Sequence, residues 1–300
     1  MRFYVSTAFL DIREVVDIAR AADDLGYDGM GIPDHVINLE TLQTPYPYTK
    51  DGSRRWEAFT HWPDPWVMIG AIALATSRLR FVTTVYLPAM RDPYSAAKAI
   101  GTAACLADGR LELGVGVGWC EEEFTLMGQQ FARRGKRTDE MLQLMRALWQ
   151  PGWTEFSGEF YTTPRLEMEP TPPHIPVYVG GLSDIALRRA ARNDGWIGDL
   201  ITTDRAIASV ERLRELRAEK GLTMDDFTVL TPLTDAFLPE HFARAEAGGV
   251  TDCMTMPWRY YSGPEASLEE KLEGMARFAE DVIGPLAGQA PAADPGVTSR

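Results

Sequence analysis

The sequence predicts an α/β fold, a single TIM (β/α)8 barrel with insertions over residues 1–286. Strand-like and helix-like segments alternate along almost the whole 300-residue chain and make about eight strand-then-helix units. No obvious linker divides the chain in the middle, which favours one closed barrel over two domains. A doubly wound open sheet shows the same alternation and is the main alternative.

Periodicity and the positions of glycine and proline define the elements in order. In the first expected helix, apolar residues repeat on one face at 3.6-residue spacing, and Gly26 ends it. Pro93 stands where a helix begins, a position that tolerates its missing N–H. The expected strands cover residues 2–6, 28–33, 79–87, 111–117, 176–179, 195–201, 227–233 and 250–256. The expected helices cover residues 12–25, 65–75, 93–106, 137–149, 184–192, 204–220, 239–247 and 267–283.

Two long segments interrupt this alternation. Residues 36–64 follow the second strand and are polar and aromatic, with Trp56 and Trp62 among them. Loops after barrel strands lie on the catalytic face, so we expect this insertion at the rim of the active site. Residues 151–175 follow a helix and are expected to cover either face of the barrel. Residues 287–300 show no periodicity and are expected to form a flexible tail.

The charge balance argues against several classes of partner. With 43 acidic and 30 basic residues the net charge is -13, whereas nucleic acids and anionic membranes are bound by basic faces. No window approaches the roughly 18 uncharged apolar residues of a membrane span, and we expect no cleaved leader. The three cysteines, Cys105, Cys120 and Cys253, lack disulfide or metal spacing and suit a reducing cytoplasm.

Asp34 and His35 stand at the end of the second expected strand, which is the usual position of catalytic groups in a barrel. Because histidine titrates near neutral pH, His35 can donate a proton or hold a hydrogen bond to a charged cofactor ring. The structural alternative is that His35 only caps the strand and binds a backbone carbonyl.

In residues 111–118, which contain the expected strand 111–117, Leu and Val alternate with Glu and Gly. One strand face therefore carries Gly114, Gly116 and Gly118. Glycine weakens a strand and marks the close approach of a ligand or of another backbone. This face is either packed tightly inside the barrel or forms the floor of a ligand site.

The turn at residues 179–184 joins an expected strand to an expected helix and contains two consecutive glycines, Gly180 and Gly181. Backbone N–H groups at such a turn bind anions, typically a phosphate. Alternatively, Ser183 or Asp184 serves only as the helix cap. The double glycine exceeds what a cap requires and favours the phosphate site.

Other chemistry has little support in the sequence. The four histidines are scattered and no metal-binding histidine motif occurs, so no metal site is expected. The Gly-x-Ser-x-Gly motif of serine hydrolases is also missing. Arg137 and Glu140 have the spacing of a helical pair, and we expect them on a solvated face or in a structural salt bridge.

Taken together in order, six stretches of the chain resemble the luciferase-like monooxygenase superfamily. More narrowly, they are similar to its oxidoreductases that use the deazaflavin coenzyme F420. Each stretch is weak alone, but the ordered set spans nearly the whole chain and is specific for the superfamily. The stretches are residues 26–35, 80–88 with Pro93, 111–124, 133–140, 176–181 and 186–196.

The resemblance implies a barrel of the bacterial luciferase type, with a tricyclic coenzyme ring at the carboxyl ends of the strands, and a homodimer. His35 matches the active-site histidine of the F420 enzymes. The Thr84–Val85 pair matches the position of a non-prolyl cis peptide bond behind the ring, and the turn with Gly180 lies near the coenzyme's phosphate. The coenzyme contacts expected are Asp34, His35, Thr84, Val85, Gly118, Trp119, Gly180, Gly181, Leu182 and Ser183.

Two positions depart from the sugar-phosphate dehydrogenases of this superfamily. Leu39 stands where some of them carry an aromatic residue, and Trp119 stands where they carry an acidic residue. We therefore expect a flatter or more apolar substrate than a sugar phosphate.

The expected function is hydride transfer between coenzyme F420 and a small organic substrate, with His35 as the catalytic residue that stabilises charge or moves a proton. An FMN-dependent monooxygenase uses the same barrel and is the first alternative. A non-catalytic protein that binds a flavin or deazaflavin is the second, and a metal-dependent barrel hydrolase is a distant third.

Overall fold

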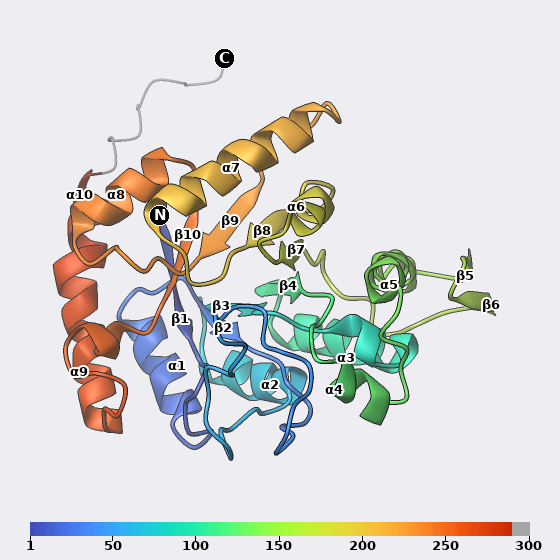
Figure 1. Ribbon diagram of the computed structural model, residues 1–300, viewed down its shortest axis with the longest axis horizontal. Coiled ribbons are helices and arrows are strands. Elements are labelled where there is room, and N and C mark those ends of the chain that lie inside the picture. The colour runs from blue at the N-terminus through green and yellow to red at the C-terminus, as the bar shows by residue number, and fades with distance from the viewer. Residues whose placement is uncertain (290–300) are drawn as a thin grey trace.

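A computed structural model describes residues 1–289 of the chain (Figure 1). Eight parallel strands close into a barrel in the order β1-β10-β9-β8-β7-β4-β3-β2. The pairing of β1 with β10 closes the ring, which confirms the TIM barrel and excludes the doubly wound sheet. The barrel strands are β1 Arg2–Ser6, β2 Gly29–Ile32, β3 Arg80–Thr83, β4 Leu111–Val115, β7 Val177–Gly180, β8 Gly195–Ile197, β9 Thr228–Thr231 and β10 Asp252–Thr255.

Helices surround the barrel and alternate with its strands, as the periodicity predicts (Figure 1). They are α1 Val15–Asp24, α2 Pro65–Ala75, α3 Pro93–Leu106, α4 Glu121–Leu126, α5 Arg134–Leu148, α6 Asp184–Ala190, α7 Thr203–Ala218, α8 Pro239–Ala247, α9 Leu268–Phe278 and α10 Gly284–Gln289. Short 3-10 segments, Pro88–Met90 and Pro257–Tyr260, follow β3 and β10, and a π-helical turn at Ala279–Ile283 joins α9 to α10.

Side-chain caps set the first turn of several helices. In each, a side-chain oxygen accepts a hydrogen bond from a backbone N–H that the helix itself leaves unpaired. The capping residues are Asp64 for α2, Asp92 for α3, Ser183 for α6, Thr202 for α7 and Ser267 for α9. Each of these polar residues directly precedes the first residue of its helix, which explains why the helices begin where they do.

The interior of the barrel is filled by side chains. On β4, Leu111, Leu113 and Val115 pack into the core beneath the helices, so Glu112 and Gly114 face the barrel axis. Glu112 is fully buried there and accepts a hydrogen bond from the Tyr4 hydroxyl at 2.9 Å. The apolar residues of this interior layer are Tyr4, Val82, Tyr178, Ile197, Leu230 and Met254. The barrel is thus a packed core, and its chemistry belongs to the strand ends.

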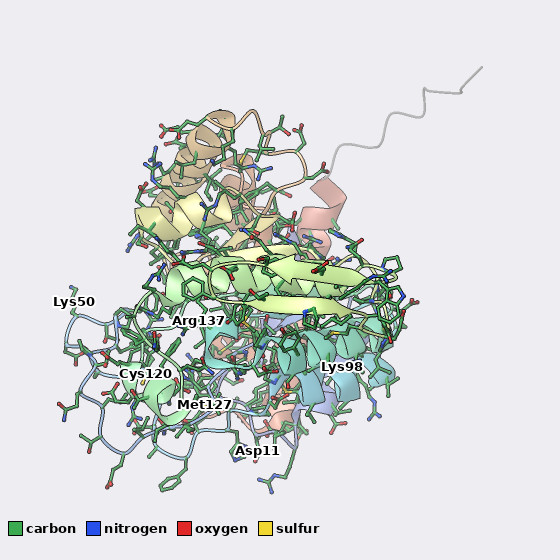
Figure 2. The ribbon with its side chains drawn as sticks, turned by 90° about the vertical axis from the view of Figure 1, so that its right-hand side faces the viewer. Asp11, Lys50, Lys98, Cys120, Met127 and Arg137 are labelled. Carbon is green, nitrogen blue, oxygen red and sulfur yellow. The ribbon has the colours of Figure 1, made fainter. Side chains whose placement is uncertain are left out.

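The second insertion, residues 151–175, contains an antiparallel hairpin of β5, Thr154–Ser157, and β6, Thr162–Leu166. Its turn is anchored by Glu140 of α5, which accepts hydrogen bonds from three successive backbone N–H groups, beginning with that of Glu159 at 2.8 Å. The hairpin therefore lies on the outside of the barrel against α5 (Figures 1 and 2).

The expected pairing of Arg137 with Glu140 is wrong. Arg137 is buried rather than solvated, and its guanidinium donates to the backbone carbonyls of Ala89 and Gln130. Both residues thus bind backbone groups of neighbouring segments, because those groups lie under α5 and need partners.

The last part of the chain differs from the expected tail at its start. Residues 287–289 belong to α10, and the remainder of the expected tail, residues 290–300, lies outside the described residues. None of the helices within residues 1–289 is long and apolar enough to cross a membrane.

Candidate active site

The first insertion, residues 36–64, spans the mouth formed by the carboxyl ends of the strands. On one side, Glu122 of α4 accepts hydrogen bonds from the backbone N–H groups of Gln43 at 2.6 Å and Thr44 at 2.9 Å. On the other side, Arg55 donates to Asp199, just after β8, at 2.8 Å. These contacts hold the insertion between the segments that follow β4 and β8, at the face where barrel enzymes carry their catalytic groups.

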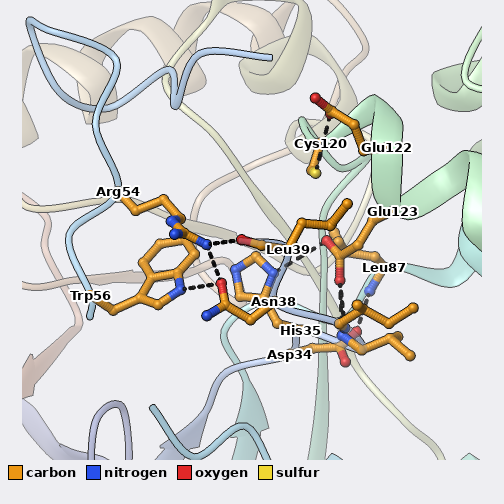
Figure 3. A network of polar contacts seen from close by, with 12 residues as sticks. Asp34, His35, Asn38, Leu39, Arg54, Trp56, Leu87, Cys120, Glu122 and Glu123 are labelled. Atoms are coloured by element: carbon orange, nitrogen blue, oxygen red, sulfur yellow. Dashed lines mark hydrogen bonds and ion pairs between the residues drawn. The ribbon is translucent and has the colours of Figure 1, made fainter. Parts of the chain in front are cut away.

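His35 lies under this insertion, three residues after the end of β2. Its Nδ1 is 3.3 Å from Oε2 of Glu123, and its side chain is 14% exposed (Figure 3). The other oxygen of Glu123, Oε1, accepts from the backbone N–H groups of Val36 at 2.9 Å and Ile37 at 3.2 Å. His35 therefore does more than cap its strand, because a buried carboxylate holds its imidazole.

The surroundings of Glu123 keep its carboxylate charged. Burial raises the pKa of Glu123, but the hydrogen bond and charge of His35 and the N–H groups of Ile37 and Val36 lower it more. The resulting pKa lies below the usual value of a glutamate. A charged acceptor thus stands beside the imidazole at neutral pH.

Four aromatic residues, Tyr46, Trp56, Trp62 and Trp119, enclose the imidazole, and we call them the aromatic box. The ring centroids of Trp56 and Trp62 lie 4.8 and 4.9 Å from that of His35, and Trp119 lies at 6.4 Å. Tyr46 closes the box at 5.4 Å from Trp56 and 5.1 Å from Trp119. Nε1 of Trp62 is buried and has no hydrogen-bond partner among the described residues. The box therefore offers apolar faces, and the Nε1–H of Trp62 is a buried donor within it that residues 1–289 leave unsatisfied.

Asp34 faces away from this box. Its carboxylate is 1% exposed and bound at two points by Arg91, with Nη1 to Oδ2 at 2.6 Å and Nη2 to Oδ1 at 2.7 Å. The backbone N–H of Leu87 donates to the same carboxylate at 3.1 Å. The carboxylate of Asp34 is thus already paired, and this side chain joins the loops after β2 and β3.

The peptide bond between Thr84 and Val85 is cis, and it stands directly after the end of β3. Strand β3 ends at Thr83, so it is shorter than the strand expected over residues 79–87. Both residues are half-buried at the mouth. A Cβ added at Gly116 or at Gly180 would lie 2.6 or 2.8 Å from the Val85 side chain. Two of the glycines singled out in the sequence thus make room for Val85, and the geometry favours tight packing over a bare ligand floor.

The other glycines of that strand face are also packed against protein. A Cβ at Gly114 would meet the carbonyl oxygen of Thr83 at 1.9 Å, and one at Gly118 would meet the ring of Phe124 at 2.6 Å. Gly118 also has a φ of 77°, which favours glycine. The contact that requires glycine at position 118 is therefore with Phe124.

The turn after β7 does two things. The Ser183 hydroxyl accepts from the backbone N–H of Ala186 and caps α6, so the capping role is confirmed. The carbonyl oxygen of Gly181 accepts from Nε1 of the buried Trp196 at 2.8 Å. Leu182 lines an open pocket of about 250 Å³ beside the mouth.

This pocket carries more positive than negative charge. Its cationic side chains are Lys50, Arg55 and Arg205, and its one carboxylate is Asp199, which pairs with Arg55. An anionic group next to the β7 turn would therefore meet two further cations, Lys50 and Arg205.

Glu123, Arg91 and the cations of the pocket were not predicted as site residues from the sequence. Glu123 and Arg91 each lie eight residues beyond the ends of β4 and β3, so the strand-end rule that identifies His35, three residues after β2, does not reach them. Within residues 1–289 no group of three or more His, Cys, Asp or Glu side chains is arranged to hold a metal ion. The three cysteines of the chain form no disulfide.

A barrel with a histidine after its second strand and a cis bond after its third agrees with the resemblance noted above. Residues 3–247 match the luciferase-like monooxygenase family. The chain belongs to this family. It is an enzyme. Membership of this family does not support the two alternatives of a non-catalytic binding protein and of a metal-dependent hydrolase.

The chain is similar to curated proteins of Mycobacterium and Rhodococcus. An uncharacterized protein of Mycobacterium tuberculosis (strain H37Rv) is 40% identical over 291 residues, which are 94% of this chain and 99% of that protein. The F420-dependent glucose-6-phosphate dehydrogenase 2 of Rhodococcus jostii (strain RHA1) is 31% identical over 226 residues, 71% of this chain and 62% of that protein.

Solved structures show the same fold with two coenzymes. The coenzyme F420-dependent tetrahydromethanopterin reductase from Methanopyrus kandleri superposes with a TM-score of 0.73 at 14% identity and covers 95% of this chain and 99% of that one. The oxygenating constituent of 3,6-diketocamphane monooxygenase from Pseudomonas putida, in complex with FMN, superposes with a TM-score of 0.62 at 18% identity, over 91% and 84% of the two chains.

Proposed function

We propose that this enzyme transfers a hydride between coenzyme F420 and a small organic substrate. The observation that carries the proposal is His35, held by Glu123 and enclosed by the aromatic box at the end of β2. Relatives named as F420-dependent dehydrogenases support the choice of coenzyme over FMN. The alternative function is that of an FMN-dependent monooxygenase, and the titration described below distinguishes it from an F420-dependent enzyme.

The residues at the mouth fit a deazaflavin. The buried N–H of Trp62 lacks a partner, and a ring carbonyl would supply one. Val85 presents a half-buried apolar side chain at the mouth, against which a flat ring packs. The pocket beside Leu182 would hold the coenzyme's phosphate with Lys50 and Arg205. We assign Thr84, Gly180, Gly181 and Ser183 to the backbone that shapes these two surfaces.

When bound, the reduced coenzyme supplies a hydride from C5 of its ring. The chain's own residues supply orientation and proton handling. His35 moves a proton or stabilises charge at Nε2, since Nδ1 is engaged by Glu123. The aromatic box excludes water from the imidazole and presents flat faces to the substrate, which strengthens polar interactions inside it.

We also propose a flat or apolar substrate rather than a sugar phosphate. The side chains within ring contact of His35 are three tryptophans, and the nearest carboxylate, Glu123, is already bound to His35 and to backbone N–H groups. Stacking on indole faces favours conjugated or apolar compounds.

The enzyme is proposed to act as a homodimer in the cytoplasm. Helix α2 is apolar on all sides, although Val67 and Leu74 are 76% and 75% exposed. A helix that is apolar on every face is ordinarily covered, and a second copy of the chain is the cover that the family resemblance implies. The unpaired cysteines agree with a reducing compartment.

The test is a paired fluorescence titration of the purified enzyme with F420 and with FMN. Binding of F420 at micromolar concentration without binding of FMN is expected. Replacing Arg205 by Ala should weaken F420 binding by roughly tenfold, the value of one charge-assisted contact to a phosphate. Arg214→Ala, on the same helix but outside the pocket, is the matched control. If the enzyme binds FMN and does not bind F420, the proposal of F420 is wrong and FMN is the coenzyme.

A further inference from the structure

The two oxygens of Glu123 face different partners. Oε1 lies 2.9 Å from the backbone nitrogen of Val36 and 3.2 Å from that of Ile37. Backbone N–H groups only donate, so Oε1 is an acceptor whatever the state of the imidazole. Oε2 is left to face Nδ1 of His35 at 3.3 Å. Glu123 is 1% exposed, so water does not compete for these positions.

A charged carboxylate can only accept hydrogen bonds. Nδ1 of His35 must therefore carry the hydrogen that bridges it to Oε2. In a neutral imidazole the other nitrogen, Nε2, is then unprotonated and acts as an acceptor. Figure 3 shows that second nitrogen on the side of the ring opposite Glu123, toward Trp56.

We propose that Glu123 is the positioning residue of this site, which fixes the proton of His35 on Nδ1 and turns Nε2 toward the aromatic box as the proton acceptor. The inference deepens the proposed function, since it rests on His35 meeting the substrate or coenzyme there. Glu123 touches neither; it acts through His35. Once Nε2 takes up a proton, the carboxylate 3.3 Å from Nδ1 balances the charge of the imidazolium.

The packing around the ring reinforces this orientation. Trp56 and Trp62 lie within 4.9 Å of the imidazole centroid, so a rotation that exchanges the two nitrogens would have to displace them. Glu123 comes from α4 and these tryptophans come from the insertion, so two separate segments hold one side chain.

The substitution Glu123→Gln tests the proposal because it replaces the hydrogen-bond acceptor opposite Nδ1 by a donor while keeping the shape of the side chain. The two N–H groups of Val36 and Ile37 keep the amide oxygen on their side, which places the NH2 group against Nδ1. His35 must then accept at Nδ1 and carry its proton on Nε2. The same carboxylate-to-amide change leaves the histidine of Ser-His-Asp enzymes in the wrong tautomer.

The measurement is two-bond ¹H–¹⁵N NMR of the full chain labelled at histidine nitrogen, with the His35 signals assigned from the spectrum of His35→Asn. In the unmodified enzyme the Nδ1–H form is expected in roughly tenfold excess or more, as one charge-assisted hydrogen bond dictates. In Glu123→Gln the Nε2–H form should predominate. Glu122→Gln is the matched control, because Glu122 binds Gln43 and Thr44, and it should leave His35 unchanged.

The proposal is overturned by an Nε2–H form or an even mixture in the unmodified enzyme, or by an unchanged His35 spectrum in Glu123→Gln. Should Glu123→Gln fail to fold, as circular dichroism would show, the tautomer of the unmodified enzyme decides alone. The spectra are recorded without coenzyme. A failure of the F420 titration therefore removes the proposed function and leaves the role of Glu123 to be judged separately.

Discussion

Asp34 and Arg91 form a buried, two-point ion pair that joins the end of β2 to the turn after β3. Burial lowers the pKa of Arg91, but the charge and hydrogen bond of Asp34 raise it more, so the guanidinium stays charged. Arg91 also lies over the ring of Tyr86, 4.5 Å from its centroid. The pair fixes the backbone next to His35 from below.

Removing one partner should therefore be costly. Arg91→Ala leaves the carboxylate of Asp34 buried without its cation, and we expect the free energy of unfolding to fall by about 3–5 kcal/mol in urea denaturation. Arg188→Ala removes an exposed ion pair with Asp184 and should leave stability unchanged. Equal effects of the two substitutions would show that the buried pair contributes no more than a surface pair.

Residues 36–64 should open locally more often when the ion pair between Arg55 and Asp199, in the segment after β8, is removed. Arg55→Ala removes the ion pair with Asp199 and the contacts of the guanidinium with the rings of Tyr46 and Tyr48. We expect thermolysin to cleave within residues 36–64 roughly three- to tenfold faster, because local opening becomes easier. Arg244→Ala, which removes an exposed pair elsewhere, should not change that rate. An unchanged rate in Arg55→Ala would mean that other contacts hold the insertion.

Stability should depend on pH through Asp252 on β10. Burial raises its pKa, the hydrogen bond and charge of Arg2 lower it, Glu112 raises it, and the result is about 6 against an ordinary 3.8. The folded state thus binds the proton of the Asp252 carboxyl more tightly than the unfolded chain does. The protonated carboxyl therefore adds to the free energy of unfolding below pH 4, and this contribution is lost as pH rises through 6.

Asp252→Asn should remove this dependence. The difference in unfolding free energy between Asp252→Asn and the unmodified enzyme should shift by about 2 kcal/mol in favour of the variant between pH 4.5 and 7.5. Denaturant titrations at both pH values measure it. Parallel behaviour of the two proteins over this range would exclude a raised pKa at Asp252.

The apolar face of α2 provides a test of the homodimer. The double substitution Val67→Glu and Leu74→Glu places two charges on that face, and sedimentation velocity should then report a monomer. Ile185→Glu, at a position 71% exposed on α6, should leave the dimer intact. If the unmodified enzyme is a monomer, the proposed dimer is wrong. If the double variant is still a dimer, the interface between the two copies does not involve this face of α2.

The position of His35 could be predicted because the rule behind it is local: a strand ends and a polar pair follows. Glu123 could not be predicted in the same way. It lies 88 residues further along the chain, and only the pairing of both β2 and β4 with β3 brings the loops after β2 and β4 together. Nothing in the acidic run of residues 121–123 indicates which carboxylate turns inward.

Several short elements were not predicted, and two of them illustrate the physical reasons. Helix α4 has six residues, too few to show a 3.6-residue period. Strand β6 contains Pro164, which normally argues against a strand, yet the two-stranded sheet leaves its edge unpaired and tolerates the missing N–H. The barrel strands and longer helices were predictable because their patterns extend over enough residues to be distinctive.

The two anchor points of residues 36–64, on Glu122 and on Asp199, stand outside the packed interior of the barrel. Amino-acid changes within residues 36–64 can therefore accumulate without disturbing the packed layers inside the barrel, on which folding depends. Duplicated copies of such a gene could diverge in what they admit to the mouth by altering this single stretch, while the scaffold and its histidine are inherited intact.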